Sequence, residues 1–340
     1  MSCLNKSESS FFSRYALCSG FISISLMICV LFSTSIDYLH RVFHAVGPLV
    51  KPVTLVIESN SSLKKVDQLL VEHGVIEDKK FLLWTAFSIG KLVFSPSKMI
   101  KAGEWKFQSG ISMSEAIEHM SDGLPVLHRI TFPEGWTSDQ IANRLNNSSL
   151  LRGDRVLPPA EGVLMPDTYS FVLGQTKQQI LTEMAVAMEE TLQEIWEGRD
   201  IDLPISNKKE LLVLASIVEK EVRRPEEARR VAAVFINRIR RGMRLEACPT
   251  VIYAIHKGDS WLKERVLTNE DISFSSSYNT YKVYGLPPGP ICHPGRASME
   301  AVAHPMKTDE LFFVANGKGG HVFSKTFQEH RRNILKFAGV

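Results

Sequence analysis

The pattern of apolar and polar residues divides the chain into an uncharged N-terminal run and a longer region of short alternating elements. Residues 15–36 carry no charged side chain. As a helix rising about 1.5 Å per residue they would reach about 33 Å, enough for a bilayer core of about 30 Å. The run predicts a transmembrane helix over residues 15–39, after a cytoplasmic tail (1–14) and before a stalk (40–52). A cleaved signal peptide is the stronger alternative, and a buried soluble helix the weaker one.

Residues 53–125 show the order strand, helix, helix, strand. Val53–Ile57 and Gly103–Phe107 have the composition of strands, and a helix is predicted from Asp78 to Phe87. Ser61 or Ser62 is predicted to cap a helix before this one. Ser112 is predicted to cap a helix after the second strand, where Glu115 completes a capping box. The order and size resemble a LysM peptidoglycan-binding module, so we expect a small LysM-like βααβ subdomain. A generic small α+β module fits the pattern nearly as well.

Residues 126–340 are predicted to form a larger α+β domain. A strand over Val126–Phe132 leads into a Pro-Glu-Gly-Trp turn at residues 133–136, and Gln175–Trp196 has the periodicity of a long amphipathic helix. Near the C-terminus, a hairpin is expected around the glycine-rich segment Asn316–His321. The whole chain is thus predicted to be an α+β protein with one N-terminal membrane span.

The clearest candidate for chemistry is Glu219, at the end of the apolar run Leu211–Val218. A run that is apolar nearly all round predicts a helix buried on most sides, which Pro225 then terminates. Glu219 continues the apolar stripe, and it lies at the negative end of the helix dipole. Both effects disfavour its charged form, as a general acid requires, although the neighbouring cations oppose them. The alternative is a helix-end glutamate paired with an arginine.

The same segment offers one acid and no evident pair. Glu221 lies two residues further on, about 200° around the helix, so it cannot share a cleft side by side with Glu219. Glycoside hydrolases usually need two carboxylates. A single acid suits a sugar that supplies its own nucleophile, as N-acetylmuramyl residues can through the C6 hydroxyl.

Candidate binding residues follow this helix. Asn237 and Arg238 lie near the end of the next helix, and Tyr278 and Asn279 precede the stiff turn Gly285–Ile291. Proline and glycine hold such a turn in place, and exposed tyrosine and asparagine side chains beside it suit sugar binding by stacking and hydrogen bonding. The alternatives are structural: Asn237 bonded to loop carbonyls, Arg238 solvated, and a tyrosine packed on the core.

Composition and spacing disfavour several other functions. A net charge of +3 gives no reason to expect a nucleic-acid partner. The histidines of the C-terminal region form no i, i+4 pair and the five cysteines form no C-x-x-C pair, so we expect no metal and no cofactor. The glycine-rich segment lacks the ending of a phosphate-binding loop.

Together these segments resemble the YceG-like family of endolytic murein transglycosylases. The resemblance covers most of the chain after the predicted stalk, in the family's order and spacing. It is carried by Glu161-Gly162, Pro166–Tyr169, Leu214–Glu221, Val231–Arg238, Gly242–Leu245, Pro249–Tyr253, Tyr278–Tyr281, Gly285–Ile291, Phe313–Ala315 and Gly319–His321.

The resemblance implies an activity. Such lyases cut the β-1,4 bond between N-acetylmuramic acid and N-acetylglucosamine within glycan strands, and they leave 1,6-anhydromuramyl ends without consuming water. The family's catalytic glutamate falls on Glu219, which protonates the leaving oxygen and then accepts the proton of the C6 hydroxyl. The residues expected to bind substrate are Asn237, Arg238, Thr250, Tyr278, Asn279, Tyr281 and His321.

The resemblance also implies a setting. The partners would be peptidoglycan glycan strands and the cell-wall synthases (penicillin-binding proteins), with the enzyme ending nascent strands. The catalytic domain is placed outside the inner membrane because of this substrate, since the positive charges flanking the span are balanced.

One departure from the family keeps two alternatives open. Cys248 stands where the family commonly has Asp before Pro-Thr-Val. A catalytically weak or inactive peptidoglycan-binding scaffold is therefore the first alternative. A muramidase-type hydrolase is the second, and it would need Asp167 or Glu161 as its second acid.

Overall fold

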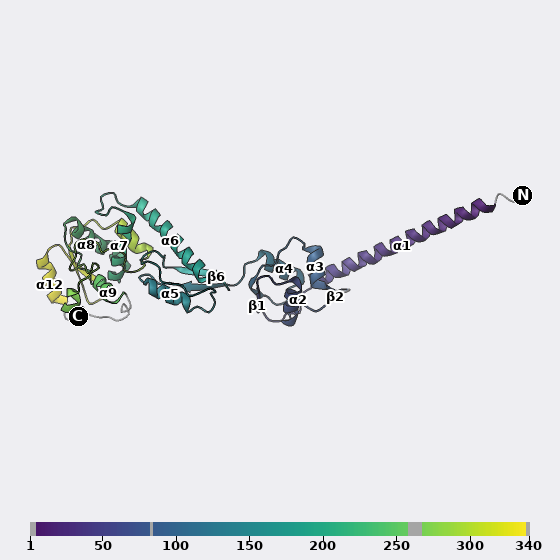
Figure 1. Ribbon diagram of the computed structural model, residues 1–340, viewed down its shortest axis with the longest axis horizontal. Helices are drawn as coiled ribbons and strands as arrows, with labels where there is room; N and C mark the ends of the chain where they lie inside the picture. Colours follow the sequence, from purple (N-terminus) through teal and green to yellow (C-terminus); the bar gives the residue numbers. More distant parts are fainter. Residues whose placement is uncertain (1–4, 82–83, 258–266, 338–340) are drawn as a thin grey trace. The chain divides into compact units, whose positions relative to one another are not determined.

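The computed structural model describes residues 5–81, 84–257 and 267–337 (Figure 1). The chain forms two compact units, Met1–His128 and Arg129–Val340. Both mix helices with short antiparallel strand pairs, which confirms the predicted α+β class.

The first element is the helix α1 (Asn5–His44), drawn in purple in Figure 1. Within it, Ile24–His44 is long and apolar enough to cross a membrane by length and composition. The helix extends beyond the predicted span at both ends and includes the first residues expected as a stalk. It continues because Leu39 and Phe43 are buried in the core of the N-terminal unit. Gly90 permits this approach, since a Cβ there would lie 2.2 Å from the Phe43 ring.

The N-terminal unit is built on the antiparallel pair β1 (Val53–Ile57) and β4 (Gly103–Phe107). Alternate side chains of both strands are buried against the helices. These helices are α2 (Leu63–Glu72), α3 (Ala86–Phe94) and α4 (Met113–Asp122). The strand β1, the helices α2 and α3 and the strand β4 follow one another in the predicted order, but a short hairpin that was not predicted lies between the two helices. The predicted cap at Ser62 and the capping box at Ser112 and Glu115 are present.

The predicted helix from Asp78 to Phe87 is wrong. Lys80–Phe81 (β2) and Trp84–Thr85 (β3) pair as a short hairpin, and α3 begins only at Ala86. Thr85 is its N-cap and accepts a hydrogen bond from the Ser88 amide.

The C-terminal unit begins with a small layer of strands and helices. Strands β5 (Leu127–Thr131) and β6 (Thr168–Val172) pair. Together with α5 (Ser138–Asn146), α6 (Lys177–Gly198) and the segments between them, they form one apolar cluster. The predicted strand and long helix are confirmed within two residues of their bounds.

The larger core of this unit surrounds α7 (Lys208–Glu221), whose residues 211–218 are all buried as predicted. Around or beyond it lie the one-turn 3₁₀ helix η1 (Pro225–Glu227), α8 (Ala228–Arg240), α9 (Cys248–His256), α10 (Asn269–Ser273), α11 (Arg296–Ala303) and α12 (Phe327–Phe337). Strands β7 (Phe312–Ala315) and β8 (His321–Ser324) form the predicted hairpin. Helix α7 packs against α6, α8, α9 and α11, so its last turn is held from several directions.

Candidate active site

Glu219 lies in the last turn of α7, and its carboxylate meets the start of α11. The amide of Gly295, the N-cap residue of α11, donates to Oε2 at 3.1 Å, and the hydroxyl of Ser298 donates to the same oxygen at 2.7 Å. Both hydrogen bonds described for this carboxylate thus come from an amide and a hydroxyl, rather than from a guanidinium. The positive end of the α11 dipole favours a negative charge at this place.

The turn at residues 133–136 packs against the same end of α7. The Lys220 ammonium donates to the Gly135 carbonyl at 3.2 Å, and a Cβ on Gly135 would lie 3.5 Å from Cγ of Glu219. Gly135 has a φ of +74°, a conformation that favours glycine. The predicted turn therefore belongs to the surroundings of the catalytic candidate.

This turn brings a second carboxyl group to the site. The Glu134 side chain lies against Gly295, where an added Cβ would be only 1.8 Å from Glu134 Oε1. The amide of Gly295 also binds Glu219, so standard backbone dimensions place the two carboxyl groups no more than about 7 Å apart. Partial burial raises the pKa of Glu134, and the charges of Glu219 and Asp167 raise it further.

A buried hydrogen-bond network holds the loops around Glu219 and Glu134. Glu161 accepts two contacts from the Ser138 amide, at 3.2 and 3.1 Å. The Ser138 hydroxyl lies 2.9 Å from Nε2 of His293, whose Nδ1 accepts from the Leu164 amide at 3.0 Å. Burial lowers the pKa of His293 to about 3, so the ring is neutral and carries its proton on Nε2. Burial raises the pKa of Glu161 to about 7, although the Ser138 hydrogen bonds oppose the rise.

The segment that carries Gly295 is bound on both sides. His293 exchanges backbone hydrogen bonds with the turn, from Gly135 N to His293 O and from His293 N to Trp136 O, both at 2.8 Å. On the α7 side, the Ser216 hydroxyl accepts from the Ile291 amide at 3.1 Å. The catalytic candidate is thus surrounded by rigid backbone from three segments.

The two cysteines of this unit are free thiols in different places. Cys292 is fully buried, and its thiol faces the Ser216 carbonyl at 3.4 Å. Cys248 is exposed, and its sulfur lies 3.2 Å from the Tyr281 hydroxyl. Cys248, which replaces the aspartate common in the family, therefore lies beside Tyr281.

Four of the residues expected to bind substrate donate side-chain hydrogen bonds to backbone carbonyls of the fold. Asn237 donates to the carbonyls of residues 308 and 310, as its structural alternative predicted. Arg238 is buried rather than solvated, and it donates to the carbonyls of residues 311 and 245 at 2.7 and 2.8 Å. Thr250 and Asn279 are fully buried and donate to backbone carbonyls. Arg238, Thr250 and Asn279 are buried and Asn237 is partly exposed, and the hydrogen bonds of all four side chains hold loop backbone in place.

The other three expected residues are partly exposed but separate. The Tyr278 ring lies 5.0 Å from that of Tyr253, and burial together with the charge of Glu161 raises the pKa of both. Tyr281 lies beside Cys248, and Nδ1 of His321 lies 2.8 Å from a carboxylate oxygen of Glu227. In the described part of the chain, none of these three side chains forms a hydrogen bond or an ion pair with Glu219.

Glu221, the other carboxyl of the last turn of α7, has a different environment. Burial raises its pKa to about 7, and the charge of Arg238 opposes the rise. Among the residues that the structure describes, Glu221 forms no hydrogen bond or ion pair with Glu219, in agreement with its position about 200° around the helix.

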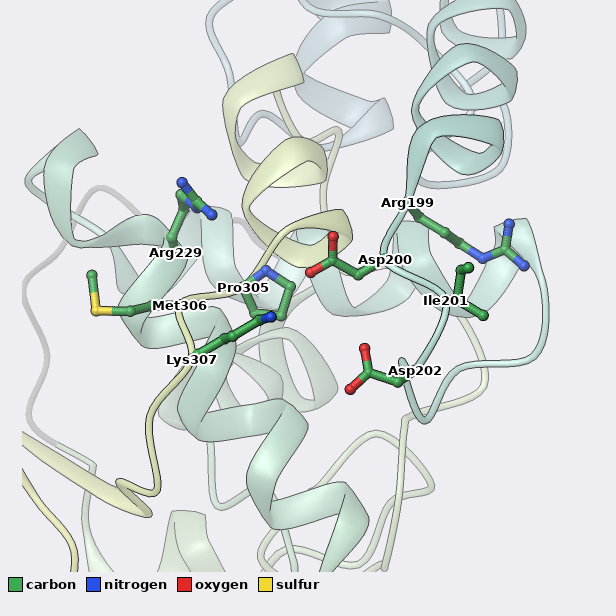
Figure 2. Close-up of a pocket in the computed structure, with 8 residues that line it drawn as sticks. All are labelled: Arg199, Asp200, Ile201, Asp202, Arg229, Pro305, Met306 and Lys307. Atoms are coloured by element: carbon green, nitrogen blue, oxygen red, sulfur yellow. The ribbon is translucent and has the colours of Figure 1, made fainter.

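A hollow of about 670 Å³ lies away from this site (Figure 2). In the figure, the carboxylates of Asp200 and Asp202 point toward the segment carrying Pro305 and Lys307, whereas Arg199 points away. Asp200 and Asp202 are bound to His304 and Arg240 at 2.9 and 3.2 Å. The eight residues of α11, about 12 Å at 1.5 Å per residue, separate His304 from Gly295. This hollow therefore does not include the Glu219 site.

Within the residues that the structure describes, no group of three or more His, Cys, Asp or Glu side chains could hold a metal ion.

Comparison with known proteins gives one family. The chain matches the YceG-like family over residues 55–336. An endolytic murein transglycosylase of Bacillus subtilis is 28% identical over 316 residues, which cover 84% of each chain. One from Streptococcus pneumoniae is 29% identical over 337 residues, covering 84% of this chain but 58% of its own length. A crystal structure of a yceG-like protein from Listeria monocytogenes is 30% identical, with a TM-score of 0.49, and covers 83% of this chain and 99% of that one.

Proposed function

Because this chain belongs to the YceG-like family, we propose that it is an endolytic peptidoglycan lytic transglycosylase with Glu219 as its catalytic acid and base. Its substrate is the β-1,4 bond between N-acetylmuramic acid and N-acetylglucosamine inside a glycan strand. The observation that carries the residue assignment is the pair of hydrogen bonds that hold one carboxylate oxygen of Glu219 at the start of α11.

These hydrogen bonds assign different tasks to the two carboxylate oxygens. Oε2 accepts from Gly295 and Ser298, so the transferable proton belongs on Oε1. That proton passes to the glycosidic oxygen as its bond to C1 of the muramyl sugar breaks. The C6 hydroxyl of the same sugar then bonds to C1, and its proton returns to Glu219. The cleavage balances without water and leaves a 1,6-anhydro ring.

The partly exposed side chains of Tyr278 and Tyr281 are proposed to contact the glycan. Tyr278 and Tyr281 present ring surface next to backbone that Asn279 holds from inside. Aromatic faces of this kind suit the apolar faces of sugar rings. Asn237, Arg238, Thr250 and His321 serve the site indirectly, by fixing the loops that carry it.

The N-terminal unit is assigned to anchoring and glycan binding. Its strand-helix-helix-strand order around β1 and β4 supports a LysM-like subdomain over residues 53–125. Helix α1 supports a single-pass anchor in the inner membrane, with the catalytic unit on the extracytoplasmic side. In that position the enzyme would work beside cell-wall synthases and end nascent strands.

A hydrolase is the second candidate, because Glu134 adds a carboxyl group within about 7 Å of Glu219. This upper limit is compatible with the carboxyl separations found in glycoside hydrolases. The second acid would then be Glu134, instead of Asp167 or Glu161. The position of Cys248 beside Tyr281 argues against an inactive scaffold, since the departure lies away from the contacts of Glu219.

The test is mass spectrometry of soluble products after the full chain, in detergent micelles, digests purified peptidoglycan. We expect anhydromuramyl-ended fragments of several disaccharides, absent with Glu219→Gln and unchanged with Glu190→Gln, an exposed glutamate of α6. Reducing-end products would replace the lyase by the hydrolase. Retained activity in Glu219→Gln would exclude Glu219 as the acid.

A further inference from the structure

The helix α1 indicates where a membrane would end on this chain. The uncharged run closes at Ile36, and the exposed ion pair of Asp37 and Arg41, with a separation of 2.7 Å, follows it directly. Leu39 and Phe43 are buried in the core of the N-terminal unit, so this part of the helix packs against protein rather than lipid. The hydrocarbon core around an anchored chain therefore ends near Ile36.

Helix α3 packs on α1 just beyond this boundary. A Cβ on Gly90 would lie 2.2 Å from the Phe43 ring, and the Phe94 ring lies 5.3 Å from the ring of His40. From Gly90 to Phe94, α3 therefore runs from the level of Phe43 to that of His40, toward the apolar run of α1. The last turn of α3 is thus the part of this helix nearest the membrane.

The level of His40 falls within the headgroup layer of a bilayer. His40 follows Ile36 by four residues, about 6 Å along the helix at 1.5 Å per residue. The headgroup region of each leaflet is about 5–8 Å thick, which is half the difference between the whole bilayer and its hydrocarbon core. Tyr38 is exposed at this depth, and tyrosine is a residue type that favours the headgroup layer.

The last turn of α3 carries exposed apolar side chains at this level. Leu92 and Val93 are 58% and 50% exposed, although Ala86, Phe87 and Gly90 of the same helix are buried. Adjacent exposed apolar side chains indicate an interaction surface. The boundary between headgroups and acyl chains is where short amphipathic segments bury such side chains.

We propose that the last turn of α3 is a second membrane contact, in which Leu92 and Val93 insert at the boundary between lipid headgroups and acyl chains. The occupant of this surface is lipid because the surface lies directly beside the level at which the exposed apolar part of α1 leaves the bilayer. The contact holds the N-terminal unit against the membrane, so the unit does not swing freely on a stalk. This inference rests on the membrane anchor proposed for α1.

The test is photolabelling of the full chain in vesicles of phosphatidylethanolamine and phosphatidylglycerol. The vesicles contain a phospholipid with a diazirine on its acyl chain, and mass spectrometry locates the labelled peptides. We expect label on α1 and on the peptide that contains the last turn of α3. In the double variant Leu92→Gln, Val93→Gln the α3 label should fall about tenfold, because burial of an apolar side chain of this size changes a partition equilibrium by about that factor. The α1 label and the melting temperature should stay as in the wild type.

Val186→Gln is the matched control, since Val186 lies on α6 and has the same exposed fraction as Val93, 50%. This control should leave the α3 label unchanged. A labelled α1 with an unlabelled α3 would overturn the proposal, and so would an undiminished α3 label in the double variant. A second copy of the chain on this face, detected by cross-linking in the vesicles, would also overturn it. If α1 is unlabelled as well, the proposed anchor fails and this surface fails with it, whereas the products released from peptidoglycan report separately on the proposed activity.

Discussion

Replacing Ser298 by alanine tests how α11 serves the catalytic glutamate. The Ser298 hydroxyl is nearly buried and donates to Glu219 Oε2 at 2.7 Å, the shorter of the two hydrogen bonds to that oxygen. The substitution removes this donor and leaves the Gly295 amide. Because negative charge develops on Glu219 as it protonates the leaving oxygen, the bond strengthens in the transition state. The loss should therefore appear in kcat rather than in KM.

The expected magnitude follows from the chemistry of the bond. Hydrogen bonds to charged groups contribute about 1.5–3 kcal/mol, and the partial exposure of Glu219 favours the lower end. At about 1.4 kcal/mol per factor of ten, kcat should fall roughly tenfold.

The assay is the initial rate of release of anhydromuramyl fragments from peptidoglycan by the full chain, measured across substrate concentration and pH. Ser121→Ala is the matched control, because the Ser121 hydroxyl is buried in the N-terminal unit and has no hydrogen-bond partner among the described residues. The Ser121→Ala control should leave the initial rate unchanged, and it should not lower the stability of the protein. A Ser298→Ala enzyme with wild-type kcat would refute the reasoning.

The remaining predictions concern stability. Because burial raises the pKa of Glu161 from 4.5 to about 7, its stabilising contribution is complete below pH 4.5 and is lost as pH rises through about 7. Glu161→Gln should therefore raise the free energy of unfolding at pH 8 by up to about 3 kcal/mol and change it little at pH 4.5; equal changes in denaturant melts at both pH values would contradict this. Arg238→Lys should lose hydrogen bonds to two buried carbonyls, lowering stability by about 3 kcal/mol and the melting temperature by about 6–12 °C. Glycan pull-down below that temperature should be unchanged, and weaker binding at an unchanged melting temperature would restore Arg238 as a sugar contact.

Much of the fold could be predicted because its signals are local. The capping box of Ser112 and Glu115 needs only residues three apart, and the burial of residues 211–218 follows from a run that is apolar on every side. The error at α3 arose where two caps competed. Both Asp78 and Thr85 could begin a helix, and the Thr85 hydroxyl also donates to Asp67 at 2.5 Å. That contact joins residues 18 apart, so local reasoning could not find it.

The site was predictable only in part for the same reason. Glu219 was identified because a carboxyl group continued an apolar stripe, which is a property of one helix. Its partners Gly295 and Ser298 lie 76 and 79 residues away. The candidates for a second acid were Glu221 on the same helix and Asp167 or Glu161 upstream, whereas the carboxyl group that lies against Gly295 belongs to Glu134. The sequence did contain a signal for Glu134, because this residue stands between a proline and a glycine. Such a turn fixes the direction in which the side chain points.

The expected sugar-binding residues show why a motif does not reveal which of its members touch the ligand. Short polar side chains in irregular segments are needed to satisfy buried backbone carbonyls that no helix or sheet can serve. Asn279 does this for residues 272 and 274 and also accepts from the Tyr281 amide, while Thr280 bonds the hydroxyl of Thr250. The two inner residues of the segment Tyr278–Tyr281 are buried and the two outer tyrosines are partly exposed. The buried pair thus fixes the backbone that presents the aromatic rings, so loss of Asn279 should weaken glycan binding through the placement of both tyrosines.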